Sequence, residues 1–252
     1  MNNNQSPQRI LIIGATSAIA IACARKWAEK KAHFFLVGRN PEKLQQTSQD
    51  LSARGANAVT TRVLDLNKLE EHHAILNACY DVLGQIDIAL IAHGSLPNQK
   101  ACEQNVDLAL REFSNNCLST ISLLTLLANR MEAHHSGTIA VISSVAGDRG
   151  RPSNYLYGSA KAAVTAFCEG LRARLFKTGV HVLTIKPGLV DTPMTQGLPL
   201  PKLLMATPER VAKDIVRAIQ FKKNTIYTPN FWRWVMFMVK SIPHFIFKRM
   251  EI

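Results

Sequence analysis

The stretch Arg9-Ile-Leu-Ile-Ile-Gly14-Ala-Thr-Ser-Ala18-Ile-Ala20 decides the fold, because it joins an apolar run to a helical pattern through a short turn. An apolar run that closes on a glycine is typical of a buried strand leading into a tight turn. A strand, a turn and a helix in this order direct backbone N–H groups and the positive end of the helix dipole at one place. The stretch therefore predicts a phosphate site, although a buried first strand of any α/β protein has the same appearance.

Apolar runs alternate with helical patterns along the rest of the chain. Strands are expected at residues 34–37, 58–64, 86–92, 139–142 and 181–185, and helices near 41–54, 68–83, 116–134, 157–178 and 207–220. This alternation predicts an α/β fold, a Rossmann-type, doubly wound parallel sheet with helices on both faces. The 252 residues contain nothing that resembles a linker or a repeat, so we expect a single domain.

The strongest candidate for chemistry is a set of three polar residues, Ser144, Tyr157 and Lys161. Tyr157 and Lys161 lie one helical turn apart and Ser144 closes an apolar run, so the three side chains can converge on one carbonyl oxygen. We expect Lys161 to favour the phenolate and to lower the pKa of Tyr157 from about 10, as proton transfer near neutral pH requires. A tyrosine and a lysine at this spacing also occur by chance on amphipathic helices.

Together, the first turn and these three residues resemble the short-chain dehydrogenase/reductase family over nearly the whole chain. The resemblance implies an NAD(P)-dependent oxidoreductase that acts on CH–OH or C=O groups. It implies catalytic roles for Ser144, Tyr157 and Lys161, and it places at Asn116 the asparagine that holds a helix kink and a proton-relay water.

The same resemblance defines the expected cofactor site. The glycine-rich turn of the family falls on residues 14–20, where Ala18 and Ala20 stand at the second and third glycine positions. Ala18 narrows the approach of the backbone to a pyrophosphate, whereas Ala20 meets only a helix–strand contact. Residues 187–192 match the loop that caps the nicotinamide. The cofactor-binding residues implied are Gly14, Thr16, Ser17, Ala18, Ile19, Arg39, Asp65, Leu66, Ala92, His93, Gly94, Tyr157, Lys161, Pro187, Gly188, Val190 and Thr192.

The end of the second strand bears on the choice of cofactor. A carboxylate there would bind the 2′-hydroxyl of NAD, but this chain has Gly38 followed by Arg39. An arginine can form a bidentate pair with a 2′-phosphate, so NADP(H) is favoured over NAD(H), although the guanidinium can also stack on adenine. By resemblance, Asp65 would contact the adenine and His93 would either line the cofactor groove or fill it.

The loop after Ser144 carries Arg149 and Arg151 and runs into Asn154. Two arginines at the entrance to the site predict recognition of an anionic substrate group, with Asn154 as a third substrate-binding residue. A solvated surface loop is the alternative.

Residues 229–252 form an aromatic and basic tail. It contains Trp232, Trp234 and four phenylalanines, and its basic residues keep every uncharged run short of a membrane span. Arg233 and Lys240 share one helical face and apolar residues cover another, which is the pattern of a helix in the headgroup region. The net charge of +12 adds attraction to an anionic leaflet. A tail that packs on the subunit or a dimer partner and walls the substrate pocket explains the same pattern.

The loop and the tail narrow the resemblance to one branch, the decaprenylphosphoryl-2-keto-ribose reductases, which are the reductase half of an epimerase. This branch implies a keto sugar joined through phosphate to a polyprenyl chain as substrate, and a flavin-dependent oxidase as partner. A generic carbonyl, steroid or 3-oxoacyl reductase and a catalytically idle nucleotide-binding scaffold are the alternatives. We assign residues 1–8 to a disordered N-terminus, 9–228 to the dinucleotide-binding and catalytic domain, and 229–252 to the tail.

The remaining features of the sequence argue against a metalloprotein, a nucleic-acid-binding protein and a secreted protein. Five cysteines and two histidine pairs, 72–73 and 134–135, lack metal-like spacing, so we expect reduced thiols and no metal. Dispersed basic residues without a recognition motif argue against nucleic-acid binding. The sequence shows no secretory leader, so we expect a cytoplasmic homodimer or homotetramer whose tail can contact the inner face of the membrane.

Overall fold

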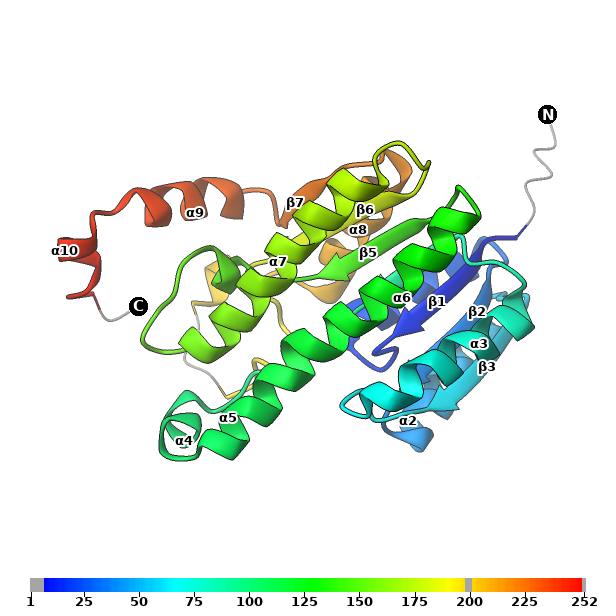
Figure 1. Ribbon diagram of the computed structural model, residues 1–252, viewed down its shortest axis with the longest axis horizontal. Helices are drawn as coiled ribbons and strands as arrows, with labels where there is room; N and C mark the ends of the chain where they lie inside the picture. The colour runs from blue at the N-terminus through cyan, green and yellow to red at the C-terminus, as the bar shows by residue number, and fades with distance from the viewer. Residues whose placement is uncertain (1–6, 198–200, 251–252) are drawn as a thin grey trace.

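Seven parallel strands form one sheet in the spatial order β3-β2-β1-β4-β5-β6-β7 (Figure 1). The strands are β1 (Arg9–Ile13), β2 (His33–Gly38), β3 (Ala58–Val63), β4 (Ile88–Ile91), β5 (Thr138–Ile142), β6 (His181–Pro187) and β7 (Thr225–Thr228). β1 pairs with β2 on one side and with β4 on the other, so the strand order reverses there. Open parallel sheets bind ligands at such a switch point. The expected α/β, doubly wound, single-domain fold is confirmed.

The computed structural model describes residues 7–197 and 201–250. Residues 1–6 of the N-terminus expected to be disordered, and residues 251–252 of the tail, lie outside this range. Gln8 already belongs to the sheet region, because its carbonyl accepts a hydrogen bond from the backbone N–H of His33 at 2.8 Å.

Helices cover both faces of the sheet because successive residues of its buried strands point to opposite sides. The helices are α1 (Ala18–Ala28), α2 (Pro41–Ala53), α3 (His72–Leu83), α4 (Gln99–Gln104), α5 (Val106–Phe113), α6 (Ser119–Ala133), α7 (Tyr155–Leu175), α8 (Pro208–Gln220), α9 (Trp232–Ser241) and α10 (His244–Phe247). In β1, Leu11 and Ile13 belong to the core with α3, α6 and α7, whereas Ile10 and Ile12 belong to the core with α1, α2 and α8. Figure 1 shows α6 and α7 in front of the sheet and α8 behind it.

Several elements differ from those expected from the sequence. The edge strand β7 and the helices α4 and α5 are additional. The helix expected near 116–134 begins as a π-helical segment, Ser114–Leu118, before it becomes α6. The helix expected near 68–83 is divided into a 3-10 turn, Leu69–Glu71, and α3. The helix expected from Tyr157 begins at Tyr155.

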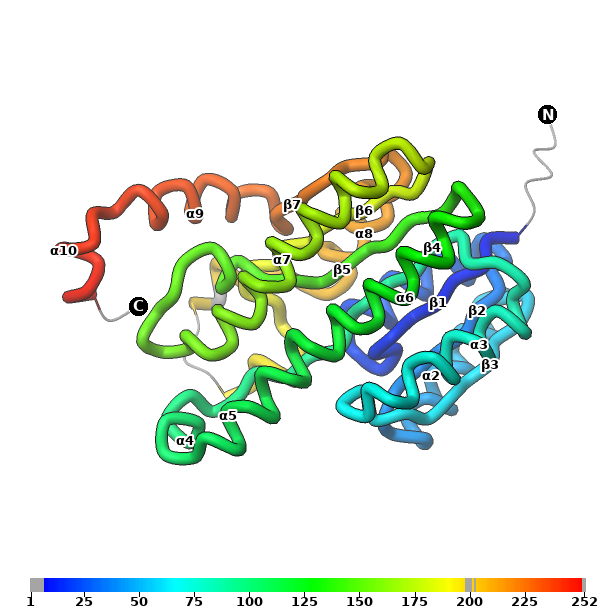
Figure 2. The backbone as a smooth tube through the Cα atoms, viewed as in Figure 1, coloured from blue at the N-terminus to red at the C-terminus, as the bar shows by residue number. Residues whose placement is uncertain are grey.

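Beyond β7, the tail forms α9 and α10, which extend away from the strands β1 to β3 (Figure 2). On the inner side of α9, Trp232 and Met236 pack with Val145 in a small core of their own. In the described parts of the chain, no helix combines the length and the hydropathy that crossing a bilayer needs.

Candidate active site

A cavity of about 570 Å³ opens where the carboxyl ends of β1, β4, β5 and β6 meet. It runs from the first turn and Arg39 to Ser144, Tyr157 and Trp232. The predicted residues that line it are Gly14, Thr16, Ser17, Ala18, Ile19, Arg39, Leu66, Ala92, His93, Gly94, Ser144, Arg151, Asn154, Tyr157, Lys161, Pro187, Gly188, Val190 and Thr192. Asp65, Asn116 and Arg149 do not line it, although the structure describes all three.

The first turn brings its backbone close to the loop after β4. Gly14 has a φ of +79°, and a Cβ there would lie 2.6 Å from the backbone nitrogen of His93, so the turn needs glycine. Ser17 caps α1, accepting a hydrogen bond from the N–H of Ala20 at 3.2 Å. The described first turn of α1 carries no acidic side chain. Its free N–H groups and the helix dipole therefore suit a phosphate.

Ser144, Tyr157 and Lys161 meet at the other end of the cavity. Ser144 accepts a hydrogen bond from the N–H of Ala146 at 3.1 Å, and Tyr157, in the first turn of α7, hydrogen-bonds with Ser144. Lys161 is 3% exposed, and its Nζ donates to the carbonyl of Ile142 at 3.2 Å. The same Nζ lies 5.7 Å from the centre of the Tyr157 ring. Their spacing in the sequence predicts this convergence.

Burial, rather than charge, sets the pKa values of the catalytic pair. Burial raises the pKa of Tyr157 to about 12, although the hydrogen bond with Ser144 opposes this rise. Burial also lowers the pKa of Lys161 to about 8. The expectation that Lys161 lowers the pKa of Tyr157 is therefore wrong, because the ammonium bonds to Ile142 while the phenol is withdrawn from water. The phenol remains protonated at neutral pH, which is the form of a proton donor.

Asn116 lies in the π-helical segment Ser114–Leu118 and is 1% exposed. Its Nδ2 donates to the carbonyl of Glu112 at 3.0 Å, and its Oδ1 accepts from the N–H of Ser95 at 3.0 Å. These bonds stabilise the widened turn and tie it to the loop after β4, where a Cβ at Gly94 would lie 2.7 Å from the Oδ1. Asn116 therefore holds the cavity wall from behind, and its part in a proton relay stays a prediction.

His93 lines the cavity, and its hydrogen bonds fix its tautomer. The hydroxyl of Ser119 donates to the carbonyl of Asn115 at 2.8 Å, so it accepts from Nε2 of His93, which is also 2.8 Å away. Nε2 thus carries the proton, and Nδ1 is a bare acceptor that has no hydrogen-bond partner among the described residues. Burial, followed by the charge of Lys161, lowers the pKa of His93 to about 3, so the ring is neutral.

Two basic residues line the end of the cavity near the first turn. Arg39 follows β2 as expected, and Lys43, in the first turn of α2, joins it. Lys43 was not predicted, although a basic residue in the first turn of the helix after β2 was the signal for it. Asp65, expected at the adenine, accepts instead from the N–H of Asn67 at 3.1 Å, while its neighbour Leu66 lines the cavity.

Arg149 turns away from the cavity, so its expected role in substrate binding is corrected. Its guanidinium donates to the carbonyl of Lys240 at 3.2 Å and of Ile242 at 2.7 Å, and also to that of Val239. It lies 3.7 Å from the centre of the Phe247 ring. Arg149 therefore satisfies the free carbonyls at the end of α9 and fixes the tail to the loop after β5.

Arg151 and Asn154 do line the cavity, as predicted. Nε of Arg151 and Oδ1 of Asn154 are buried, and no described atom hydrogen-bonds with either of them. Burial lowers the pKa of Arg151, and the charge of Asp148 opposes this effect. Because buried polar atoms without partners are rare in folded proteins, these two atoms point to a polar ligand.

Asp148 is engaged elsewhere, in a buried ion pair. Its Oδ1 accepts from Nζ of Lys186 at 2.6 Å, and its Oδ2 accepts from the hydroxyl of Tyr227 at 2.7 Å. The side chains of Lys186 and Asp148 are only 9% and 3% exposed. These bonds tie the loop after β5 to β6 and β7. The charge of Asp148 also acts on Arg151, where it opposes the effect of burial on the pKa of the guanidinium.

Trp232 is a lining residue that the sequence analysis assigned only to the tail. Its indole lies directly on the loop after β6, because a Cβ at Gly188 would be 2.0 Å from Nε1. Nε1 is buried and has no hydrogen-bond partner within the described chain. The tail thus walls the cavity, as one of its two expected roles requires, and brings a free donor to that wall.

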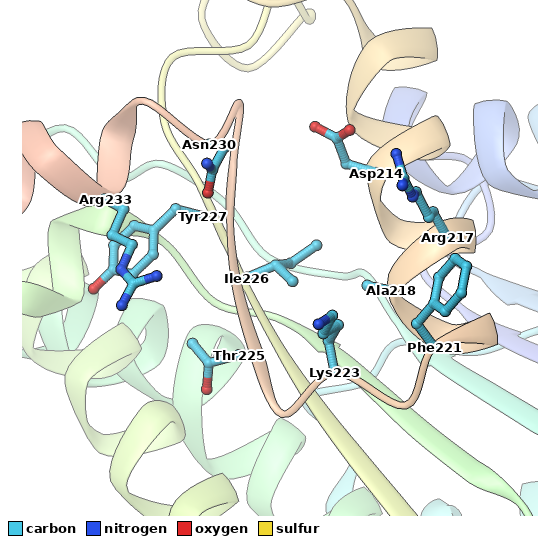
Figure 3. Close-up of a pocket in the computed structure, with 10 residues that line it drawn as sticks. All are labelled: Asp214, Arg217, Ala218, Phe221, Lys223, Thr225, Ile226, Tyr227, Asn230 and Arg233. Atoms are coloured by element: carbon cyan, nitrogen blue, oxygen red, sulfur yellow. The ribbon is translucent and has the colours of Figure 1, made fainter.

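A second hollow, of about 650 Å³, lies between α8, β7 and the start of the tail (Figure 3). Asp214 and Arg217 extend from α8 on one side of it, and Arg233 lies beside Tyr227 on the other. None of the residues that line it belongs to the predicted site. The hollow is therefore separate from the catalytic cavity.

The five cysteines are free and buried. Across residues 7–197 and 201–250, histidines, cysteines and carboxylates form no group that could hold a metal ion. Burial raises the pKa of the Cys79 thiol to about 12, so this side chain behaves as a packing residue.

Comparison with known proteins identifies the family. The model of the short chain dehydrogenase family matches residues 8–202. An uncharacterized oxidoreductase of Mycobacterium tuberculosis is 36% identical over 241 residues, which cover 96% of each chain. A ketoacyl reductase of Nostoc sp. is 29% identical and covers 86% of this chain and 77% of its own. A variant of actinorhodin polyketide ketoreductase solved with NADPH shares the fold, with a TM-score of 0.81 at 21% identity over 90% of this chain and 98% of its own.

The family match and the geometry of the catalytic residues argue against the alternative of a catalytically idle nucleotide-binding scaffold. The chain belongs to the short-chain dehydrogenase family and is an NAD(P)-dependent oxidoreductase that acts on carbonyl or hydroxyl groups.

Proposed function

We propose that the protein reduces a keto group on a sugar joined through phosphate to a polyprenyl chain, and that it prefers NADPH to NADH. The observation that carries this proposal is Arg151, whose buried Nε has no partner among the described residues at the wall of the catalytic cavity. Arg151 is half-buried and burial lowers the pKa of its guanidinium, so an anionic group bound at this wall would be favoured. The likeness of the loop and the tail to the decaprenylphosphoryl-2-keto-ribose reductases supports a phosphate as that anion.

The residues along the cavity fit a nicotinamide dinucleotide. The start of α1 offers N–H groups to a pyrophosphate, Arg39 and Lys43 offer cations to a 2′-phosphate, and Nδ1 of His93 offers an acceptor to a hydroxyl. When bound, the nicotinamide supplies the hydride that reduces the keto carbon.

Tyr157 would be the proton donor. Its raised pKa keeps the phenol protonated at neutral pH, so it can donate to the keto oxygen as negative charge develops there. Ser144 hydrogen-bonds with Tyr157 and can orient the same oxygen. Lys161, held by the carbonyl of Ile142, places a cation below the ring. Asn116 keeps this wall of the cavity in place.

The polar atoms of the cavity wall that lack hydrogen-bond partners would orient the substrate. Arg151 would bind the phosphate. Oδ1 of Asn154 would accept a hydrogen bond from a sugar hydroxyl, and Nε1 of Trp232 would donate to a sugar or phosphate oxygen. A flavin-dependent oxidase that forms the ketone would supply the substrate. Exposed Val106 and Leu110 on α5, 68% and 64% accessible, support assembly into a homodimer or homotetramer.

A second candidate is reduction of a soluble 3-oxoacyl substrate. The Nostoc relative, a ketoacyl reductase, favours it. The two candidates are separated with three ketones: a keto pentose joined through phosphate to a short prenyl chain, the same keto pentose without phosphate, and a 3-oxoacyl thioester. We expect the first to exceed the second in kcat/KM by about 10- to 150-fold, because a charged hydrogen bond is worth about 1.5–3 kcal/mol. Fastest turnover of the thioester would favour the second candidate.

The cofactor preference gives a separate prediction. Arg39→Ala should weaken NADPH binding by about 5- to 150-fold and leave NADH binding nearly unchanged, because only NADPH carries the 2′-phosphate. Fluorescence titration with each cofactor measures this, and Arg217→Ala, outside the cavity, is the matched control. Equal affinities of the wild type for the two cofactors would contradict the assignment.

A further inference from the structure

The tail has a second apolar face that is largely exposed in the described chain. On the inner side of α9, Trp232 and Met236 are 6% and 1% exposed. On the outer side, Trp234, Phe237 and Met238 are 67%, 62% and 66% exposed. In α10, the exposed apolar residues are Phe245 and Ile246, at 62% and 45%. These five side chains, which we call the outer face, are too large and too close in sequence for ordinary surface scatter.

The outer face is held rigidly. Trp232 and Met236 pack into the small core with Val145, and Arg149 binds the carbonyls at the end of α9 and the ring of Phe247. Residues 232–247 are thus held by the small core around Val145 and by the contacts of Arg149. The exposure of the outer face is therefore a property of the docked tail rather than of a frayed terminus.

The described part of the tail carries basic charges and no acidic ones. Residues 215–250 contain no aspartate or glutamate. Lys240, Lys248 and Arg249 are exposed on the same segment, and Arg233 is exposed at the hollow beside Tyr227. Large exposed apolar side chains on a basic segment match the interface of an anionic bilayer. A second copy of the same face would oppose like charges across a symmetric contact, which argues against self-association.

We propose that the outer face of α9 and α10 binds the surface of a membrane that contains anionic lipid. The helices lie in the headgroup region, with the aromatic and aliphatic side chains inserted and Lys240, Lys248 and Arg249 against phosphates. Because Trp232, on the inner side of α9, lines the catalytic cavity, binding sets the cavity beside the lipid surface. This proposal does not depend on the identity of the substrate, since it concerns a surface outside the cavity.

Sedimentation of the full chain with vesicles tests the proposal. The protein should sediment with vesicles of phosphatidylcholine and phosphatidylglycerol, and far less with phosphatidylcholine alone. Trp234→Ser/Phe237→Ser/Met238→Ser should lower the partition constant by at least about 50-fold, because the inserted apolar area is lost. Lys240→Gln/Lys248→Gln/Arg249→Gln should lower it by about fivefold for each charge removed, and added salt should weaken wild-type binding.

Matched controls place the changes elsewhere on the surface. Phe176→Ser removes a ring that is 81% exposed just beyond α7, and Lys30→Gln/Lys177→Gln/Lys213→Gln removes three exposed charges outside the tail. Both controls should sediment like the wild type, and every variant should keep its NADPH affinity as a test of folding.

Three results would overturn the proposal. Wild-type protein that stays in the supernatant at low salt excludes the membrane. Equal sedimentation of tail variants and controls shows binding by net charge alone. An outer-face variant that changes the oligomer, without vesicle binding by the wild type, assigns the face to a second copy of the chain.

Discussion

Replacing Tyr157 by phenylalanine is expected to lower kcat for ketone reduction by about 10²–10⁴-fold, because this is the usual contribution of a positioned general acid. The phenol lines the cavity, is hydrogen-bonded with Ser144 and is protonated at neutral pH, so the variant loses the hydroxyl that would donate the proton. Steady-state turnover followed by NADPH absorbance measures the effect.

NADPH affinity provides the control for this variant. Tyr157 is placed to transfer a proton rather than to hold the cofactor, so Tyr157→Phe should bind NADPH within a few-fold of the wild type. Ser144→Ala should show a smaller loss of kcat, since it orients the oxygen without supplying the proton. If Tyr157→Phe kept more than about a tenth of wild-type kcat, another group would have to be the acid.

Asp148→Asn is expected to lower the free energy of unfolding by about 3–5 kcal/mol, because removing one partner leaves the charge of Lys186 buried and uncompensated. The side chains of Asp148 and Lys186 are 3% and 9% exposed and 2.6 Å apart, so solvent screens the pair little. Urea unfolding of both proteins measures the difference. The variant should also lose substrate affinity, since Asp148 fixes the loop that carries Arg151.

A double variant separates the loss of the pair from the loss of packing. Asp148→Leu/Lys186→Met removes both charges and keeps apolar bulk, so it should recover most of the lost stability. A loss below about 1 kcal/mol in Asp148→Asn, or a double variant as unstable as the single one, would show that the pair is not what holds the loop.

Much of the fold follows from the sequence because the central strands are apolar runs and several helices begin at a recognisable cap. Pro41 after Asn40 and Pro208 after Thr207 are examples. The strand β7 is missed for the opposite reason. Its four residues, Thr225–Thr228, carry no strong apolar pattern and follow two lysines, so only pairing with β6 makes them a strand.

Some residues of the site could likewise be predicted from the sequence, and others could not. Ser144, Tyr157 and Lys161 could be predicted because strand ends and helical spacing fix where they point. The direction of Arg149 could not, since a loop side chain is placed by tertiary partners, in this case the end of α9 and Phe247. The pKa of Tyr157 could not either, because its rise comes from burial that spacing does not reveal.

We propose that Arg151 selects a substrate with an anionic group beside the ketone. The most direct measurement is kcat/KM of the wild type and of Arg151→Met on a keto pentose joined through phosphate to a short prenyl chain, and on the same sugar without phosphate. The variant should lose about 10- to 150-fold on the first ketone and almost nothing on the second, with Arg151→Lys in between and Arg217→Met unchanged. Equal losses on both ketones, or no loss on either, would contradict phosphate recognition by Arg151.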